Sequence, residues 1–205
     1  MKRAVTVYAE MTPNPNTMKF VADLMLMNGG ETAEFISPAE AKGHSSMAEA
    51  LFQFPFVESL FFASNFVTIK KTPSIEWSMI TNELRDFVRT WLEEKEDVVE
   101  VIPQPREKEQ AGESGAPVIS EKPELNTEAD KMIYNLLEEY VRPAVESDGG
   151  AIDFKSFDEV TGIVTVVLRG SCSGCPSSTA TLKGGIESLL KTHMPDVQEV
   201  VALEG

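Results

Sequence analysis

The segment from residue 100 to 126 most constrains the fold, because no packed core can run through it. It carries prolines at positions 103, 105, 117 and 123, glycines at 112 and 115, and no sustained apolar period. This composition is typical of a linker. It divides the 205-residue chain into parts 1–99 and 127–205, each the size of a small domain. We predict two domains joined by a flexible linker; the alternative is an ordered loop draped on one of them.

The N-terminal part, residues 1–99, is predicted to mix strands and helices. Its strands are expected near 5–10, 17–23, 33–36 and in two pieces of 61–70, separated by turn residues such as Asn and Gly. A short helix is expected after a cap at Ser45 or Ser46. A long helix is expected from Pro73-Ser74 to about Glu94, because apolar residues recur there at helical spacing. We interpret the many aromatic residues of this part as hydrophobic core.

The C-terminal part, residues 127–205, predicts the element order αββαβ. Thr127 to Asp130 resembles a capping box, and the helix that follows is expected to end or kink at Pro143. Strands are expected over 151–157, 162–168 and 197–203, with a helix reaching about His193 before the last strand. Gly184-Gly185 lies inside that helix, where glycine is unfavourable, so we expect close packing or a bend there. The predicted class is α+β, with two small α/β-sandwich-like domains.

Composition excludes several classes of partner. The chain has 18 Lys+Arg and 33 Asp+Glu, a formal net charge of −15, whereas binding to nucleic acid needs clustered basic residues. The longest apolar stretches are strand-sized, so no membrane span is expected. The N-terminus lacks the features of a signal peptide, and we therefore expect a cytoplasmic protein whose thiols stay reduced.

The two cysteines of the chain, Cys172 and Cys175, form a CxxC motif in a loop between a predicted strand and a predicted helix. This spacing lets two sulfurs face one metal ion or one edge of a cluster. Gly170 and Gly174 are expected to let the backbone fold tightly and donate N–H groups toward sulfur. Pro176 suits the first position of the helix, whose N-terminus favours thiolates.

Several kinds of site remain open on these residues. A structural zinc site needs four ligands, and His193 is expected to lie too far from Cys175 to be a third. A thioredoxin-like redox pair fits CxxC at a helix start, but a hairpin precedes the motif here. Two chains that each give two thiolates can bind an iron–sulfur cluster, or a zinc ion, across a dimer. Incidental cysteines are the remaining alternative.

Both parts of the chain resemble the NifU family known as Nfu. Residues 127–205 resemble its C-terminal domain, and residues 4–95 resemble the N-terminal domain that accompanies it. The C-terminal matches are Val141-Arg142-Pro143, Asp148-Gly149-Gly150, the run from Leu168 to Ser178, and Thr181-Leu182-Lys183. The N-terminal matches are the run from Thr12 to Phe20, the Leu51-Phe52 helix, the run from Val57 to Phe62, and Phe66-Val67-Thr68-Ile69.

The resemblance implies an iron–sulfur cluster scaffold or carrier rather than an enzyme. In the family, paired CxxC motifs hold a [4Fe–4S] cluster between two subunits and pass it to apo-proteins. Cys172 and Cys175 map onto those metal and cluster ligands. The implied partners are a second copy, apo iron–sulfur clients and an upstream cluster donor, and the cluster can be lost on purification in air. The N-terminal domain has no cysteine and is interpreted as a partner-recognition module; a thiol–disulfide oxidoreductase using the CxxC pair is the alternative function.

Overall fold

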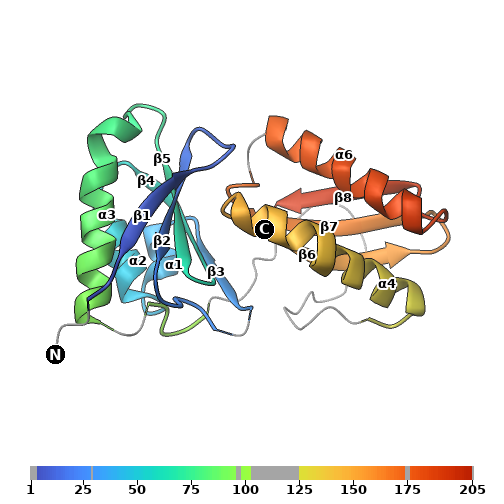
Figure 1. Ribbon diagram of the computed structural model, residues 1–205, viewed down its shortest axis with the longest axis horizontal. Helices are drawn as coiled ribbons and strands as arrows, with labels where there is room; N and C mark the ends of the chain where they lie inside the picture. Colours follow the sequence, from blue (N-terminus) through green and yellow to red (C-terminus); the bar gives the residue numbers. More distant parts are fainter. Residues whose placement is uncertain (1–3, 29, 96–97, 103–124, 174–175, 205) are drawn as a thin grey trace.

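The chain folds around two separate β-sheets, each backed by helices (Figure 1). The computed structural model describes residues 4–28, 30–95, 98–102, 125–173 and 176–204. We call the described parts up to residue 102 the N-terminal module and those from residue 125 the C-terminal module. Most of the predicted linker, residues 103–124, lies outside the described residues. The α+β class predicted from the sequence is confirmed.

The N-terminal module contains an antiparallel sheet of five strands in the order β1-β2-β5-β4-β3. The strands are β1 (Val7–Met11), β2 (Thr17–Ala22), β3 (Thr32–Phe35), β4 (Val57–Ala63) and β5 (Phe66–Lys71). Strands β4 and β5 form a hairpin, and Ser64 takes a positive φ of 44° in its turn. The predicted division of 61–70 into two strands is confirmed, with the turn at Ser64 and Asn65, although β4 begins earlier than expected.

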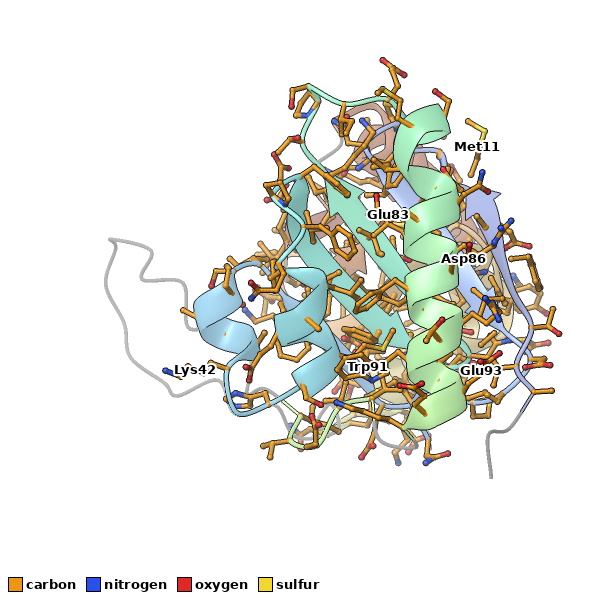
Figure 2. The ribbon with its side chains drawn as sticks, turned by 90° about the vertical axis from the view of Figure 1, so that its left-hand side faces the viewer. Met11, Lys42, Glu83, Asp86, Trp91 and Glu93 are labelled. Carbon is orange, nitrogen blue, oxygen red and sulfur yellow. The ribbon has the colours of Figure 1, made fainter. Side chains whose placement is uncertain are left out.

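Three helices cover one face of this sheet: α1 (Pro38–Ala41), α2 (Ser46–Leu51) and α3 (Trp77–Glu94). The hydroxyl of Ser45 caps α2 by accepting the N–H of Ala48 at 3.0 Å. In α3, one stripe is buried against the sheet, while Glu83 and Asp86 lie on the exposed side (Figure 2). The members of the stripe are Ile80, Leu84, Val88 and Leu92.

Helix α3 begins later than the sequence predicts. Pro73 and Ser74 precede its first residue, Trp77, because the chain before α3 is bonded to other loops. The N–H of Thr72 donates to the carbonyl of Phe56 at 2.8 Å, and the indole of Trp77 donates to the carbonyl of Pro15 at 2.9 Å. Glu76, the residue before α3, is extended, with φ −91° and ψ 141°.

The C-terminal module has the predicted αββαβ order. Its helical segments are α4 (Glu128–Leu136), the π-helix η1 (Leu137–Val141), α5 (Arg142–Ser147) and α6 (Pro176–His193). Its strands are β6 (Gly150–Asp158), β7 (Ile163–Gly170) and β8 (Glu199–Glu204). Strand β7 pairs antiparallel with β6 and parallel with β8, and α6 connects the parallel pair. The helices share one hydrophobic core with one face of this sheet.

The first helix of this module continues past Pro143, but a π-helical segment interrupts it just before the proline. The helical chain continues through Pro143 to Ser147, and the five residues of η1 immediately precede Arg142. A proline inside an α-helix removes one backbone hydrogen bond and clashes with the carbonyl four residues earlier. The wider π turn of η1 lies at that position and accommodates the ring.

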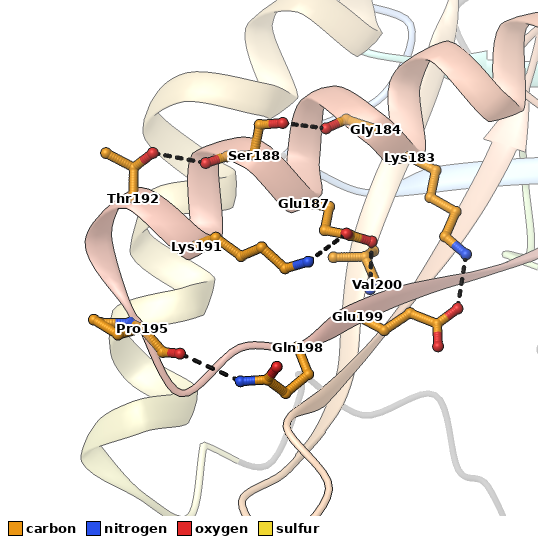
Figure 3. Close-up of polar contacts among 10 residues, drawn as sticks. All are labelled: Lys183, Gly184, Glu187, Ser188, Lys191, Thr192, Pro195, Gln198, Glu199 and Val200. Atoms are coloured by element: carbon orange, nitrogen blue, oxygen red, sulfur yellow. Dashed lines mark hydrogen bonds and ion pairs between the residues drawn. The ribbon is translucent and has the colours of Figure 1, made fainter.

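Polar contacts fix α6 against β8 (Figure 3). Lys183 binds Glu199 at 3.0 Å, and Glu187 accepts hydrogen bonds from Lys191 at 2.6 Å and from the N–H of Val200 at 3.3 Å. The close packing expected at Gly184-Gly185 is absent: among the described residues, a Cβ at either position has no neighbour within 4 Å. Helix α6 is continuous there.

We expect Thr127→Ala to lower the free energy of unfolding by about 1 kcal/mol. The Thr127 hydroxyl accepts the N–H of Asp130 at 3.0 Å, and the Asp130 carboxylate accepts the N–H of Thr127 at 3.0 Å, so the change removes half of a capping box. Urea unfolding followed by circular dichroism measures the effect. The control is Thr192→Ala, whose exposed hydroxyl binds only a carbonyl of its own helix. Equal effects of the two changes would contradict the prediction.

We expect Gly184→Ala to raise the free energy of unfolding by about 0.5–1 kcal/mol, because alanine has less backbone freedom to lose in a helix. The matched control is Gly43→Ala, which also has nothing within 4 Å but has φ +76°. There the added Cβ is strained, and the same measurement should show destabilisation. A loss of stability in Gly184→Ala would show that the helix needs glycine.

Candidate functional site

Cys172 lies two residues after the end of β7, at one end of the C-terminal sheet. Its side chain is 6% exposed and belongs to the hydrophobic core of the C-terminal module. The thiol packs against the first residue of β6: a Cβ on Gly150 would lie 2.9 Å from Cys172 Sγ and 2.6 Å from the carbonyl oxygen of Arg169. Glycine at position 150 therefore makes room for the thiol.

The second predicted ligand, Cys175, lies outside the described residues, as does Gly174. Helix α6 begins at Pro176, immediately after Cys175, as the position of this proline predicts. The structure therefore places one of the two candidate ligands.

The surroundings of Cys172 favour its neutral thiol over the thiolate. Burial raises the pKa of its thiol, a contact with the Ser171 hydroxyl lowers this pKa in part, and the negative charge of Asp148 raises it further. The glycines of the loop and the helix N-terminus predict the opposite direction for this pKa. For Cys172 that expectation is wrong, because the side chain is buried in the core, where the charged form loses its hydration.

Gly170 also has a role that differs from the one predicted. Its φ is +66°, but its N–H donates to the Glu34 carboxylate at 3.1 Å instead of pointing at a cysteine sulfur. Glu34 lies in β3 of the N-terminal module. The backbone just before Cys172 is thus held by a residue 136 positions away in the sequence.

Other residues around Cys172 were missed by the sequence analysis. Asn14 donates to the carbonyl of Ser171 at 3.3 Å, and the hydroxyl of Thr68 donates to the carbonyl of Gly149 at 2.7 Å. The Ser171 hydroxyl donates to the carbonyl of Asp148. One feature of the sequence could have pointed to these residues, because they lie inside the runs that resemble the family: Asn14, Thr68, Asp148 and Gly149. Hydrophobic periodicity alone indicated only that they belong to turns and strands.

The histidines lie away from Cys172. His44 follows α1 and its ring Nδ1 lies 3.2 Å from the carbonyl of Lys42, while His193 ends α6 with its ring 6.3 Å from that of Tyr140. Among the described residues, no three His, Cys, Asp or Glu side chains are grouped to hold a metal ion. Within the same residues, no helix has the length and apolarity needed to cross a membrane.

Comparison with known families covers both modules. Residues 7–95 match the family described as "Scaffold protein Nfu/NifU N terminal", and residues 133–201 match the "NifU-like domain". The second match contains Cys172 and Cys175, and the first contains Asn14, Glu34 and Thr68.

Individual relatives align over nearly the whole chain. A mitochondrial NifU-like protein of Saccharomyces cerevisiae is 36% identical over 98% of this chain and 82% of its own length. A NifU-like protein of Schizosaccharomyces pombe is 33% identical over 97% and 73%. A mitochondrial iron–sulfur cluster scaffold homologue of Drosophila persimilis is 33% identical over 97% and 65%. A solution structure of a Saccharomyces cerevisiae NifU-like protein has a TM-score of 0.44 and 29% identity, covering 48% of this chain and 87% of that one.

The raised pKa of Cys172 predicts how stability depends on pH. Because the folded pKa lies above the unfolded value of about 8.5, the favourable burial of the neutral thiol is fully present below that pH. It is lost as the pH rises toward the folded pKa. In a Cys175→Ser background, unfolding free energies are measured from neutral to alkaline pH with Cys172 and with Cys172→Ala. The advantage of Cys172 should fall above about pH 8.5; an advantage that grows would show a stabilised thiolate.

Proposed function

The chain belongs to the Nfu/NifU family of iron–sulfur cluster scaffold proteins, which are not enzymes, and from this premise we propose that two copies hold one [4Fe–4S] cluster between them. The ligands are the thiolates of Cys172 and Cys175 from each copy. The cluster is the cargo of the protein, which it transfers to apo-proteins.

The number of ligands is the observation that carries this proposal. A [4Fe–4S] cluster is held by four thiolates, and the chain has two cysteines. A second copy supplies the missing pair through the same motif. A symmetric dimer is the simplest arrangement that brings two identical loops together.

Reversible binding is what a carrier needs, and the surroundings of Cys172 support it. Thiols must lose a proton before they bind metal, so a raised pKa makes protons compete with iron for the sulfur. A cluster shared between two chains also has a simple route of release, because the chains can separate while thiolates of an apo-protein replace the ligands. The partners are therefore a second copy, apo iron–sulfur clients and an upstream donor.

The alternative, a thiol–disulfide oxidoreductase, is disfavoured by the same thiol. Nucleophilic cysteines of such enzymes have lowered pKa values and partial exposure, whereas Cys172 is buried with a raised pKa. A zinc-bridged dimer uses the same four thiolates and is distinguished by metal analysis. The cytoplasmic location expected from the sequence stays a prediction, and two of the relatives above are named mitochondrial.

Anaerobic reconstitution with iron and sulfide tests the proposal. We expect about four irons per two chains, a doubled mass in solution and near-complete loss of bound iron in Cys172→Ser and in Cys175→Ser. His193→Ala is the control and should retain the cluster, because its ring lies at the other end of α6. Iron retained by both serine variants, or a loaded monomer, would contradict the proposal. Reduction of insulin disulfides by the metal-free protein would favour the oxidoreductase.

A further inference from the structure

The N-terminal sheet is buried on both of its faces, although its own helices cover one. Every residue of β2 is buried. In a sheet with one covered face, alternate residues of a strand face solvent. The face opposite α3, which we call the outer face, carries Lys19, Val21, Phe61, Phe66 and Thr68, and the C-terminal module lies against it (Figure 1).

Apolar contact contributes one part of this packing. Val21, Phe61, Ala63 and Phe66 form a small buried cluster, and its fifth member is Ala151 of β6. None of the five side chains is more than 4% exposed. The start of β6 thus covers the rings of Phe61 and Phe66 and excludes water from them.

Hydrogen bonds from the outer face are directed at backbone atoms next to Cys172. Thr68 donates to the carbonyl of Gly149 at 2.7 Å, and Glu34 accepts the N–H of Gly170 at 3.1 Å. Asn14, in the loop before β2, donates to the carbonyl of Ser171 at 3.3 Å. The three bonded residues lie at the start of β6 and the end of β7, the two strand ends that enclose the Cys172 thiol.

Two glycines permit this close approach. A Cβ on Gly149 would lie 2.8 Å from the Thr68 hydroxyl, and a Cβ on Gly170 would lie 2.8 Å from the ring of Phe61. Both glycines also have positive φ, +81° and +66°. Any other residue at either position would separate the strand ends from the outer face.

We propose that the outer face of the N-terminal sheet clamps the two strand ends around Cys172, and that the clamp must open before a cluster is loaded. In the clamped state, the thiol is 6% exposed and lies against Gly150. To share a cluster with a second copy, Cys172 has to leave this packing, and the ends of β6 and β7 that enclose it have to separate. Gly149, Gly170 and Ser171 are bonded to the N-terminal module, so these bonds have to be released before loading.

The second part of this proposal rests on the proposed function, whereas the clamp itself does not. The N-terminal module thus controls access to Cys172 although it supplies no cluster ligand. The full chain is expected to load more slowly than a chain in which the outer face has lost its hydrogen bonds.

The first experiment measures access to Cys172 without metal. In a Cys175→Ser background, Cys172 is the single thiol of the chain, and its alkylation by N-ethylmaleimide is timed. Thr68→Val combined with Glu34→Ala removes two of the hydrogen bonds and should speed alkylation about tenfold, the effect of two bonds of modest net strength. The control combines Thr81→Val and Glu83→Ala on α3, where the Thr81 hydroxyl binds the carbonyl of Trp77. It should leave the rate unchanged; equal rates in all variants would overturn the clamp.

Hydrogen exchange shows whether the same bonds hold the backbone. The Gly170 amide should exchange about tenfold faster in the Thr68→Val, Glu34→Ala variant. The amide of Leu84, in the buried stripe of α3, should keep its rate and thereby show that the fold is intact. An unchanged Gly170 amide would overturn the clamp even if alkylation changed.

The second experiment measures loading in chains that keep both cysteines. Initial iron uptake during anaerobic reconstitution should be faster in the Thr68→Val, Glu34→Ala variant than in the unmodified chain. Unchanged uptake with faster alkylation would overturn the link between clamp and loading. If no chain takes up iron while the alkylation rates differ, the proposed function fails and the clamp on the thiol stands.

Discussion

The packing of the two modules against each other depends on one contact. In it, the outer face of the N-terminal sheet lies against Gly149 and Gly170. At both positions a side chain of one module approaches the backbone of the other to a distance that excludes a Cβ. This approach explains why Thr68, a polar residue, is buried at 2% exposure without cost: its hydroxyl finds a carbonyl. It also places the backbone before Cys172 under the influence of a module that contains no cysteine.

Local signals in the sequence predicted the elements well and the contacts between modules poorly. The αββαβ order and the cap at Thr127 follow from periodicity and capping chemistry, which act over a few residues. The late start of α3 and the π turn before Pro143 have no such local signature in the sequence. The predicted state of Cys172 failed for the same reason: motif and helix end favour a thiolate, but burial by distant residues decides its pKa.

Two states of the Cys172 side chain compete at this site: a buried neutral thiol and an accessible thiolate that can bind metal. A buried neutral thiol contributes to the core of the C-terminal module, as an apolar side chain of its size would. In its proposed role as a cluster ligand, the same thiol must be charged and reachable. A scaffold that releases its cargo benefits from this competition, because the empty site has a stable resting state of its own.

The outer face of the N-terminal sheet is synthesised well before the part of the chain that covers it. The strands that carry Val21, Phe61 and Phe66 are complete once residue 71 has been made, but Ala151, which covers them, is made 80 residues later. At about 5–20 residues per second, the nascent sheet exposes these apolar side chains for roughly 4–16 s. Lys19, whose ammonium lies 4.5 Å from the centre of the Phe66 ring in the folded chain, places a basic side chain on this face. Two copies of this face that met during the interval would bring basic side chains together, and like charges oppose such an association.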